Sequence, residues 1–300
     1  MSRIFFTGGT GFIGSHVLQK LRADNVDEIY ILTHDISWAN KGSDNIHYVV
    51  GSIADEEFVY QCMTEIHPEV LLHFAWDVQD TLFAEAEINR HWVVWSEYLA
   101  KCFLQCGGKR IIAAGTCFEY KLGQSKPFSA DDLCEPGSLY GQCKLHVYRA
   151  FDELCGRYGA GFVWGRIFYP YGYGENNRKF ITSAIMNLLK GDSFYCHTPM
   201  NCIDYIHVDD IANIFYRLYA RTDINGAVNI GSGRGVYLQD ILNIIEQVTG
   251  VFGKIRYNSD KSGCISIISD KELLAKLSYI CKEDLYQNIQ YMYQQLKDIG

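Results

Sequence analysis

A hydroxyl, a phenol and an amine occur in this chain in an order that suits proton transfer. Thr116 ends the stretch AAGT, and Tyr140 and Lys144 follow later in YGQCK. Residues i and i+4 lie on one face of a helix, so the phenol and the ammonium would be neighbours. A nearby cation lowers the pKa of a phenol from its ordinary value of ~10. Tyr140 could then exchange a proton with a carbonyl oxygen or an alcohol that Thr116 holds by a hydrogen bond.

A glycine-rich stretch, TGGTGFIGSH, lies between the first apolar run and the first helical pattern. Gly8 and Gly11 would let the backbone turn and approach a pyrophosphate, and Gly14 would let the helix pack closely on the strand. The N–H groups of the helix N-terminus would then face the phosphates. The stretch satisfies both GxGxxG and GxxGxxG at a strand-to-helix junction, and this context predicts a dinucleotide site.

The end of the second predicted strand bears on the choice of dinucleotide. A carboxylate there binds the ribose 2′-hydroxyl of NAD, whereas a cation accommodates the 2′-phosphate of NADP. The chain has Thr33 and His34 at this place, and Asp35 comes late. Because a hydroxyl and an imidazole suit a phosphate better than a ribose, we expect NADP, with NAD as the alternative.

The elements that must position these residues alternate between strands and helices. Six apolar runs read as strands: RIFFTGG, EIYILTHD, IHYVVGS, EVLLHFAW, KRIIAAGT and AGFVWGRIF. Helical patterns lie between most of them, notably over residues 11–23 and 85–106. Continuous apolar strands alternating with helices predict an α/β fold, a doubly wound parallel sheet of the Rossmann type. Its ligands are expected at the carboxyl ends of the strands.

The second half of the chain has a different character. A loop rich in Gly, Asn and Tyr follows residue 166, then a helical pattern at 179–190 and a helical tail over 270–298. We expect a dinucleotide-binding Rossmann domain over 1–166 that also takes 204–230. Residues 167–300 are expected to form mainly a smaller substrate-binding lobe.

Composition narrows the classes of partner. The formal charge is −8 and no basic stripe is present, which argues against nucleic acid. No apolar run approaches the ~20 residues of a membrane span. The first residues run directly into RIFFTGG, leaving no room for a signal peptide, and the eleven cysteines have no CxxC spacing. We therefore expect a cytoplasmic protein with reduced thiols and no metal site.

Several stretches carry a resemblance together. TGGTGFIG, HFAW, AAGTCFEY, YGQCK, GRIFYPYG, DYIHVDD and VNIGSG resemble the extended short-chain dehydrogenase/reductase family, the NAD-dependent epimerase/dehydratase group, in the family's order and over nearly the whole chain. Within it, GTCFEY, GGKR and GRIFYPYG resemble reductases that act at C4 of nucleotide-linked 4-keto-6-deoxyhexoses.

The resemblance implies a catalytic triad of Thr116, Tyr140 and Lys144 and a homodimer. Together with Thr33 and His34, the expected cofactor contacts are Gly8, Gly11, Phe12, Ile13, Gly14, Ser52, Ile53, Phe74, Ala75, Trp76, Tyr140, Lys144, Tyr169 and Pro170. The expected substrate contacts are Thr116, Tyr169, Arg178, Phe180 and Arg234. Ile203 stands where the family often has an arginine.

The two residues after Thr116 separate related chemistries. Members of the family that dehydrate a sugar have Asp-Glu at these places, whereas this chain has Cys117 and Phe118. Phenylalanine does not titrate and a thiol is a weak proton donor, so dehydration is disfavoured. Cys117 is expected to be a small buried residue rather than a catalytic thiol.

These observations predict an NAD(P)H-dependent reductase of the C4 keto group of a nucleotide-linked 4-keto-6-deoxyhexose, in deoxysugar biosynthesis. Tyr140 would supply the proton, Thr116 would orient the oxygen, and Lys144 would bind the nicotinamide ribose. Two alternatives stay open: a nucleotide-sugar 4-epimerase with tightly held NAD, which uses the same triad, and a non-catalytic relative that binds a nucleotide sugar.

Overall fold

The computed structural model describes residues 2–24, 28–78, 82–258, 264–282 and 284–298. Its main sheet has seven strands in the order β11-β6-β5-β4-β1-β2-β3, and the registers between neighbours from β6 to β3 are parallel. In that order the strands are Gly226–Ile230, Gly161–Ile167, Arg110–Thr116, Val70–His73, Arg3–Thr7, Glu28–Thr33 and Ile46–Val50. The predicted α/β doubly wound sheet is confirmed.

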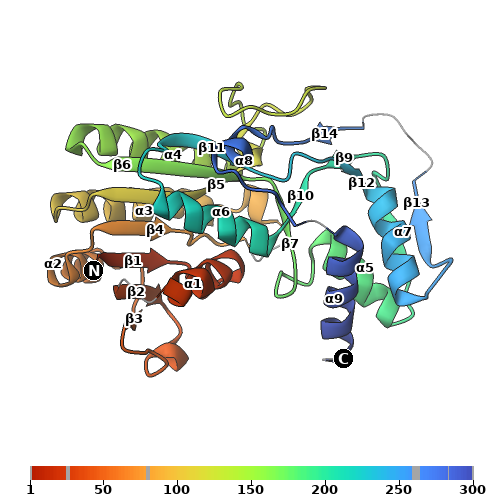
Figure 1. The fold of residues 1–300 in the computed structure, drawn as a ribbon, viewed down its shortest axis with the longest axis horizontal. Helices are drawn as coiled ribbons and strands as arrows, with labels where there is room; N and C mark the ends of the chain where they lie inside the picture. The colour runs from red at the N-terminus through yellow and green to blue at the C-terminus, as the bar shows by residue number, and fades with distance from the viewer. Residues whose placement is uncertain (1, 25–27, 79–81, 259–263, 283, 299–300) are drawn as a thin grey trace. The chain divides into compact units, whose positions relative to one another are not determined.

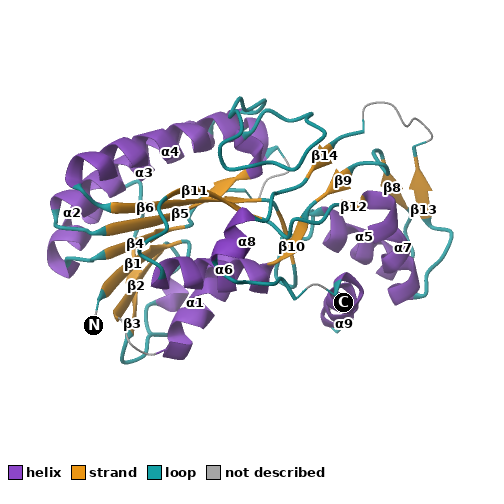
Figure 2. Ribbon diagram, turned by 45° about the horizontal axis from the view of Figure 1, so that its top comes forward, coloured by secondary structure: helices purple, strands orange, loops and turns teal. Residues whose placement is uncertain are grey.

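Helices cover both faces of this sheet. Helices α1 (Phe12–Asp24) and α6 (Val208–Ala220) lie on one face, and α2 (Glu56–Ile66), α3 (Ile88–Gln105) and α4 (Leu139–Tyr158) lie on the other (Figures 1 and 2). Strand β5 is buried at every position because both of its faces are covered. The core under α3 and α4 includes Phe5, Phe103, Ile111, Phe151 and Trp164, all fully buried.

Local capping signals set where α4 begins. The Ser138 side chain accepts a hydrogen bond from the Gly141 N–H, and Gly159 ends the helix in the left-handed conformation with φ of 66°. Both are the residue types that helix termini favour. Because the helix begins at Leu139, Tyr140 stands in its first turn and Lys144 one turn further along.

The chain divides into two compact units. Unit 1 comprises residues 1–121, 133–167 and 212–228, and unit 2 comprises 122–132, 168–211 and 229–300. The assignment of dinucleotide binding to 1–166 with 204–230, and of substrate binding to 167–300, stays a prediction.

Unit 2 is built from small sheets and four helices among its described residues. β7 (Tyr169–Tyr171) pairs with β10 (Tyr205–His207), β8 (Phe194–Cys196) with β13 (Ile255–Tyr257), and β9 (Cys202–Ile203) with both β12 (Val236–Tyr237) and β14 (Ser266–Ile267). Helices α5 (Phe180–Leu189), α7 (Leu238–Thr249) and α9 (Leu285–Lys297) pack together (Figure 1). The tail expected to be helical over 270–298 contains α8 (Glu272–Lys276) and α9, separated by non-helical chain.

Asp204 holds the glycine turn after β11. Its carboxylate accepts hydrogen bonds from the backbone N–H groups of Ser232, Gly233 and Ser269 at 2.9–3.0 Å. The hydroxyls of Ser232 and Ser269 add bonds of 2.6 and 2.7 Å. A buried carboxylate is stable when its lone pairs are satisfied in this way, so Asp204 is a structural residue of unit 2.

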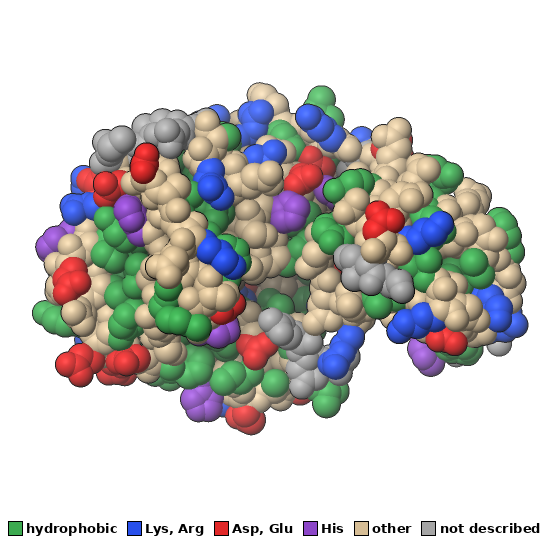
Figure 3. Space-filling view, turned by 90° about the horizontal axis from the view of Figure 1, so that it is seen from below, with side chains coloured by type: hydrophobic (Ala, Val, Ile, Leu, Met, Phe, Trp, Pro, Cys, Tyr) green, Lys and Arg blue, Asp and Glu red, His purple; other side chains and the backbone are tan. Residues whose placement is uncertain are grey.

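In the described part of the chain, no helix combines the length and the apolarity that crossing a membrane requires. On the face drawn in Figure 3, basic, acidic and hydrophobic side chains are interspersed. Among the described residues, no three His, Cys, Asp or Glu side chains are grouped so that they could hold a metal ion.

Candidate active site

The three predicted catalytic residues come together in unit 1. Thr116 is the last residue of β5, and Tyr140 and Lys144 project from α4. The Thr116 hydroxyl is hydrogen-bonded to the phenol of Tyr140. The Lys144 ammonium donates a hydrogen bond of 2.9 Å to the Ala114 carbonyl, two residues before Thr116 on the same strand. The side chains therefore converge on the carboxyl end of β5.

Lys144 lies in an apolar and aromatic environment. Its ammonium is 4.0 Å from the centroid of the Trp76 ring and 5.8 Å from that of Trp164. Burial lowers the pKa of Lys144 to about 7, and the charge of Glu119 opposes this shift. The amine can therefore carry a proton or release it close to neutral pH.

Aromatic rings surround the phenol of Tyr140. The ring centroids of Phe83, Trp76 and Phe118 lie 5.1, 6.1 and 6.5 Å from that of Tyr140. Burial raises the pKa of Tyr140, while its hydrogen bond to Thr116 lowers it. With burial the larger effect, the phenol is protonated at neutral pH and is poised to act as a proton donor.

The residues after Thr116 do not form an acid–base pair. Cys117 is 1% exposed, as expected for a small buried residue, and the next acid, Glu119, is fully buried. The Glu119 carboxylate accepts hydrogen bonds from within the protein and pairs with Arg166 at 2.8 Å. This arrangement leaves positions 117–119 without a group free to protonate a leaving hydroxyl.

The glycine turn after β1 fits a dinucleotide. Gly8 has φ of +78°, and a Cβ there would lie 2.6 Å from the Ala75 nitrogen. A Cβ on Gly14 would lie 2.0 Å from the Gly8 carbonyl oxygen. The Gly11 N–H donates to that same carbonyl at 3.0 Å, which closes the turn before α1. The backbone thus presents the N-terminus of α1 without side chains in the way, as a pyrophosphate requires. Phe12 and Ile13 are the first residues of α1.

The end of β2 carries no carboxylate. Thr33 is 5% exposed, and its hydroxyl oxygen accepts a hydrogen bond from the Asp35 N–H at 3.2 Å. The Asp35 carboxylate accepts from the Ser37 N–H at 2.8 Å and caps a short 3-10 helix over Ile36–Trp38. His34 is exposed. Asp35 is therefore occupied by a local cap, although a second acceptor oxygen remains on its carboxylate.

The other expected cofactor contacts of unit 1 follow β3 and β4. Ser52 is exposed and its hydroxyl accepts from the Ala54 N–H, whereas Ile53 is 8% exposed and belongs to the core. Phe74, Ala75 and Trp76 come directly after β4. The Trp76 indole N–H donates to Asn89 at 2.8 Å, which fixes the ring beside Lys144.

The predicted substrate residues after Thr116 lie in unit 2. Tyr169 and Pro170 are in β7, where the Tyr169 ring lies 5.6 Å from the Tyr205 ring. Arg178 is exposed in the loop before α5. Phe180 begins α5 and packs edge-on against Phe194, with ring centroids 5.6 Å apart. Their binding roles stay predictions.

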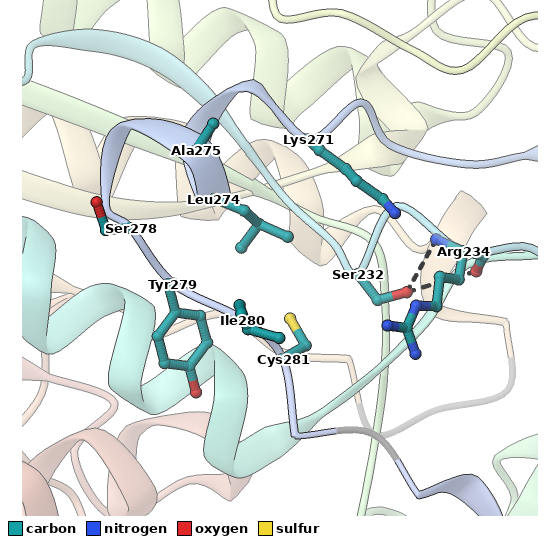
Figure 4. A pocket seen from close by; sticks show the side chains of 9 residues that line it. All are labelled: Ser232, Arg234, Lys271, Leu274, Ala275, Ser278, Tyr279, Ile280 and Cys281. Carbon is teal, nitrogen blue, oxygen red and sulfur yellow. Dashed lines mark hydrogen bonds between the residues drawn. The ribbon is translucent and has the colours of Figure 1, made fainter.

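Arg234 lines a cavity of about 440 Å³ within unit 2. Figure 4 shows Lys271 extending toward the turn that carries Ser232 and Arg234, with Leu274 on the opposite wall. The Arg234 N–H donates to the Ser232 hydroxyl at 3.1 Å. The cavity therefore has two basic side chains on a largely apolar wall, and Lys271 was not expected from the sequence.

Sequence reasoning also missed the buried polar groups behind the triad. Glu119 and Arg166 are 0% and 2% exposed and pair with each other beneath Thr116. His73 is 1% exposed and bonds Thr7 at 2.8 Å and Ser96 at 2.9 Å. The sequence holds one signal for the ion pair: Glu119 lies within the apolar stretch GTCFEY and Arg166 within the apolar stretch FVWGRIF.

A doubly wound sheet, a glycine turn after β1 and a Tyr and Lys one helical turn apart define an extended short-chain dehydrogenase/reductase. The chain belongs to the NAD dependent epimerase/dehydratase family, whose model matches residues 4–231. The family recognised from the sequence is thereby confirmed. The narrower resemblance to 4-keto sugar reductases stays a prediction.

The chain is also similar in sequence or in structure to individual proteins. The chain is 25% identical over 270 residues to a UDP-glucose 4-epimerase of Halalkalibacterium halodurans, covering 82% of this chain and 80% of the relative. A crystal structure of UDP-glucose 4-epimerase from Thermotoga maritima with UDP-glucose is similar at a TM-score of 0.87 and 21% identity, over 99% of both chains. A dTDP-glucose 4,6-dehydratase from Streptomyces venezuelae with NAD bound has a TM-score of 0.86 and 20% identity, over 99% of this chain and 97% of that one.

Proposed function

We propose that this protein is a nucleotide-sugar 4-epimerase that uses a nicotinamide dinucleotide. The observation that carries the proposal is the convergence of Thr116, Tyr140 and Lys144 at the end of β5, in the same unit as the glycine turn. The family and the UDP-glucose 4-epimerase relative support it. The sequence predicted the 4-keto reductase with the epimerase as the alternative, and the relatives favour the epimerase.

The chain's own residues account for the proton movements. The bound dinucleotide supplies the hydride acceptor and donor for C4 of the sugar. Thr116 holds the C4 oxygen by a hydrogen bond, and Tyr140 removes or returns the proton on that oxygen. A protonated Lys144 would favour the phenolate form of Tyr140, which is needed when the C4 hydroxyl loses its proton, and would oppose the burial that raises the pKa of this phenol. The same groups serve the oxidation and the reduction at C4, and the configuration inverts when the 4-keto sugar presents its opposite face for the reduction.

The glycine turn and the first turn of α1 would hold the pyrophosphate. Phe74, Ala75 and Trp76 would line the cofactor beside Lys144, and unit 2 would supply Tyr169, Arg178, Phe180 and Arg234 to the nucleotide sugar. The cytoplasmic location and the homodimer stay predictions. The choice of NADP, with NAD as the alternative, also stays a prediction.

One observation favours a second candidate, the NADPH-dependent reductase of a nucleotide-linked 4-keto-6-deoxyhexose. At the end of β2, Thr33 and His34 stand where a carboxylate would bind the ribose of NAD. A reductase must exchange its dinucleotide after each turnover, and NADPH is a reductant that suits this exchange. The triad chemistry is common to both candidates, so the β2 end is what separates them.

Two assays on the purified chain test the proposal. UDP-glucose is incubated with protein and catalytic NAD or NADP, and UDP-galactose is followed by proton NMR. In parallel, dTDP-4-keto-6-deoxyglucose is added with NADPH, and the absorbance of the reduced nicotinamide is followed. We expect the 4-epimer to form without net change in nicotinamide redox state. Stoichiometric NADPH consumption would instead identify the reductase, and ligand binding without turnover in either assay would identify a non-catalytic relative.

A further inference from the structure

We propose that Glu119 is a positioning residue that fixes the direction in which the Thr116 hydroxyl donates its proton, and that Arg166 keeps the Glu119 carboxylate in place. This inference rests on the proposed function, because it assigns the support of a proposed catalytic residue. It concerns residues that touch neither substrate nor cofactor.

The geometry forms a reciprocal pair of hydrogen bonds around Thr116. The Thr116 N–H donates to Glu119 Oε1 at 2.9 Å, and the Phe118 N–H donates to Thr116 Oγ1 at 3.3 Å. This is a capping box at the start of a 3-10 turn over Cys117–Glu119. Since Thr116 Oγ1 accepts from Phe118, its own proton is directed outward, where it meets the phenol of Tyr140. The hydroxyl is thereby set as a donor for an oxygen at the site.

Three N–H groups lock the Glu119 carboxylate. Besides Thr116, the Trp164 indole N–H donates to Oε1 at 2.9 Å and to Oε2 at 3.1 Å, and Arg166 Nε donates to Oε2 at 2.8 Å. All are N–H donors, so the carboxyl group serves as acceptor with both oxygens, which is the role of the ionised form. Burial raises the pKa of Glu119, and the charge of Arg166 opposes that rise.

Arg166 is itself held from several sides. Its guanidinium donates to the Tyr120 hydroxyl at 3.1 Å and lies 4.8 and 5.2 Å from the ring centroids of Tyr120 and Tyr148. Stacking and a directed hydrogen bond fix a guanidinium in a way that a flexible ammonium would not reproduce. Because Arg166 is held in place, the Glu119 carboxylate is held as well, and its Oε1 atom remains in position to accept from the Thr116 N–H.

The residue before the triad threonine is small for the same reason. A Cβ on Gly115 would lie 2.1 Å from the Trp164 indole nitrogen and 2.8 Å from Glu119 Oε1. A side chain at position 115 would therefore displace the Trp164 and Glu119 groups that form the hydrogen bonds behind Thr116. A buried ion pair stabilises little on net, so its presence directly behind the site is better explained by positioning than by stability.

Two double variants isolate the hydrogen bond to Thr116. E119Q/R166M removes both charges but leaves an amide oxygen that can accept from the Thr116 N–H. E119L/R166M removes the same charges with a side chain of similar size and no acceptor. Removing both ionised partners avoids an unpaired buried charge, so both variants should fold. Unfolding midpoints confirm this before any comparison.

We expect the Leu variant to have a kcat about 100-fold below that of the Gln variant, the loss typical of a ~1 Å misplacement at a site. The KM for the dinucleotide should be the same in both. A purely structural role would lower stability without separating kcat from KM. Equal kcat values in the two double variants would overturn the inference.

The experiment distinguishes this failure from failure of the proposed function. If the wild-type chain turns over no nucleotide sugar, the proposed function is wrong, and amide hydrogen exchange at Thr116, measured by NMR, decides the inference. Protection in the Gln variant and faster exchange in the Leu variant support the positioning role. Equal exchange rates contradict it.

Discussion

The Lys144 ammonium lies over the Trp76 indole, 4.0 Å from the ring centroid, while it donates to the Ala114 carbonyl. Trp76 follows β4 and Lys144 is on α4, so the contact joins two elements of unit 1 at the strand ends. The ring excludes water on one side of the amine and offers its electron-rich face to the charge. Burial outweighs this attraction, since the pKa of Lys144 is lowered to about 7.

Trp76→Ala should therefore raise the pKa of Lys144 toward its ordinary value of 10.5. Water would reach the ammonium in place of the indole and relieve the desolvation that disfavours the charged form. NMR of protein labelled with 13C at the lysine ε carbon measures the titration, with Lys144→Met identifying the signal. Trp76→Phe, which keeps a ring, is the matched control. A lower pKa of Lys144 in the Trp76→Ala variant would mean that the attraction of the ring for the ammonium outweighs the effect of burial.

Tyr140→Phe should lower kcat by ~10³-fold, because the phenol is the proposed proton donor and acceptor. The dinucleotide should still bind, since the ring and its aromatic neighbours remain. Fluorescence titration gives the affinity and the epimerase assay gives kcat. Tyr158→Phe, at the exposed end of the same helix, controls for loss of a phenol. Near-normal turnover by Tyr140→Phe would refute the catalytic assignment.

Gly14→Ala should weaken dinucleotide binding by at least about 100-fold, equivalent to ~2.8 kcal/mol. The new methyl would collide with the Gly8 carbonyl at 2.0 Å and force the phosphate turn to move. Isothermal titration with NAD and NADP measures the loss. Gly156→Ala lies inside α4, where a Cβ meets nothing within 4 Å. It should leave affinity unchanged and stabilise the fold by ~0.5–1 kcal/mol.

His73 should make the fold less stable as the pH falls below neutrality. Burial lowers the pKa of His73 from 6.5 to about 3, so the unfolded chain takes up a proton that the folded chain refuses. The stabilisation is fully present above the unfolded pKa and is lost as pH falls toward the folded value. Between pH ~7 and ~5 the wild type should lose about 2 kcal/mol more than His73→Gln in urea unfolding. Parallel losses in the two proteins would show that the imidazole titrates normally.

Arg110→Met should lower the free energy of unfolding by about 3 kcal/mol, because three acceptors lose a charged donor. Arg110 is 6% exposed, and one of its terminal nitrogens donates to the carbonyls of Leu218, Arg221 and Ile224 at 3.3, 2.9 and 2.9 Å. The Leu218 carbonyl is in the last turn of α6, and the other two carbonyls follow that helix. Arg221→Met, which breaks an exposed ion pair with Asp223, should change little. Equal effects of the two substitutions in thermal unfolding would contradict this account.

Much of unit 1 was predictable because its signals are local. Continuous apolar strands gave the parallel sheet, and the glycine turn stands at the expected junction before Phe12. Tyr140 and Lys144 share a helix face, so their proximity followed from spacing alone. Thr116 was placed beside them from its position at the end of the fifth strand and from the family resemblance, because nothing local joins β5 to α4.

What could not be predicted depends on contacts between distant parts of the chain. The role of Glu119 could not be predicted, since its partner Arg166 is on another strand. The predicted helical tail over 270–298 is interrupted between α8 and α9. Tyr279 lies in this interruption and donates a hydrogen bond to Asp210 of α6, a contact that local periodicity does not indicate. Lys271 and Arg234 line the same cavity although they are far apart in the sequence, so their proximity could not be predicted either.

The chain passes from one unit to the other after residues 121, 132, 167, 211 and 228. No single cut separates the two units, so neither can be inherited, expressed or grafted as a contiguous cassette. Altering one unit while keeping the other therefore calls for substitutions within the intact chain rather than for truncation or exchange of a segment.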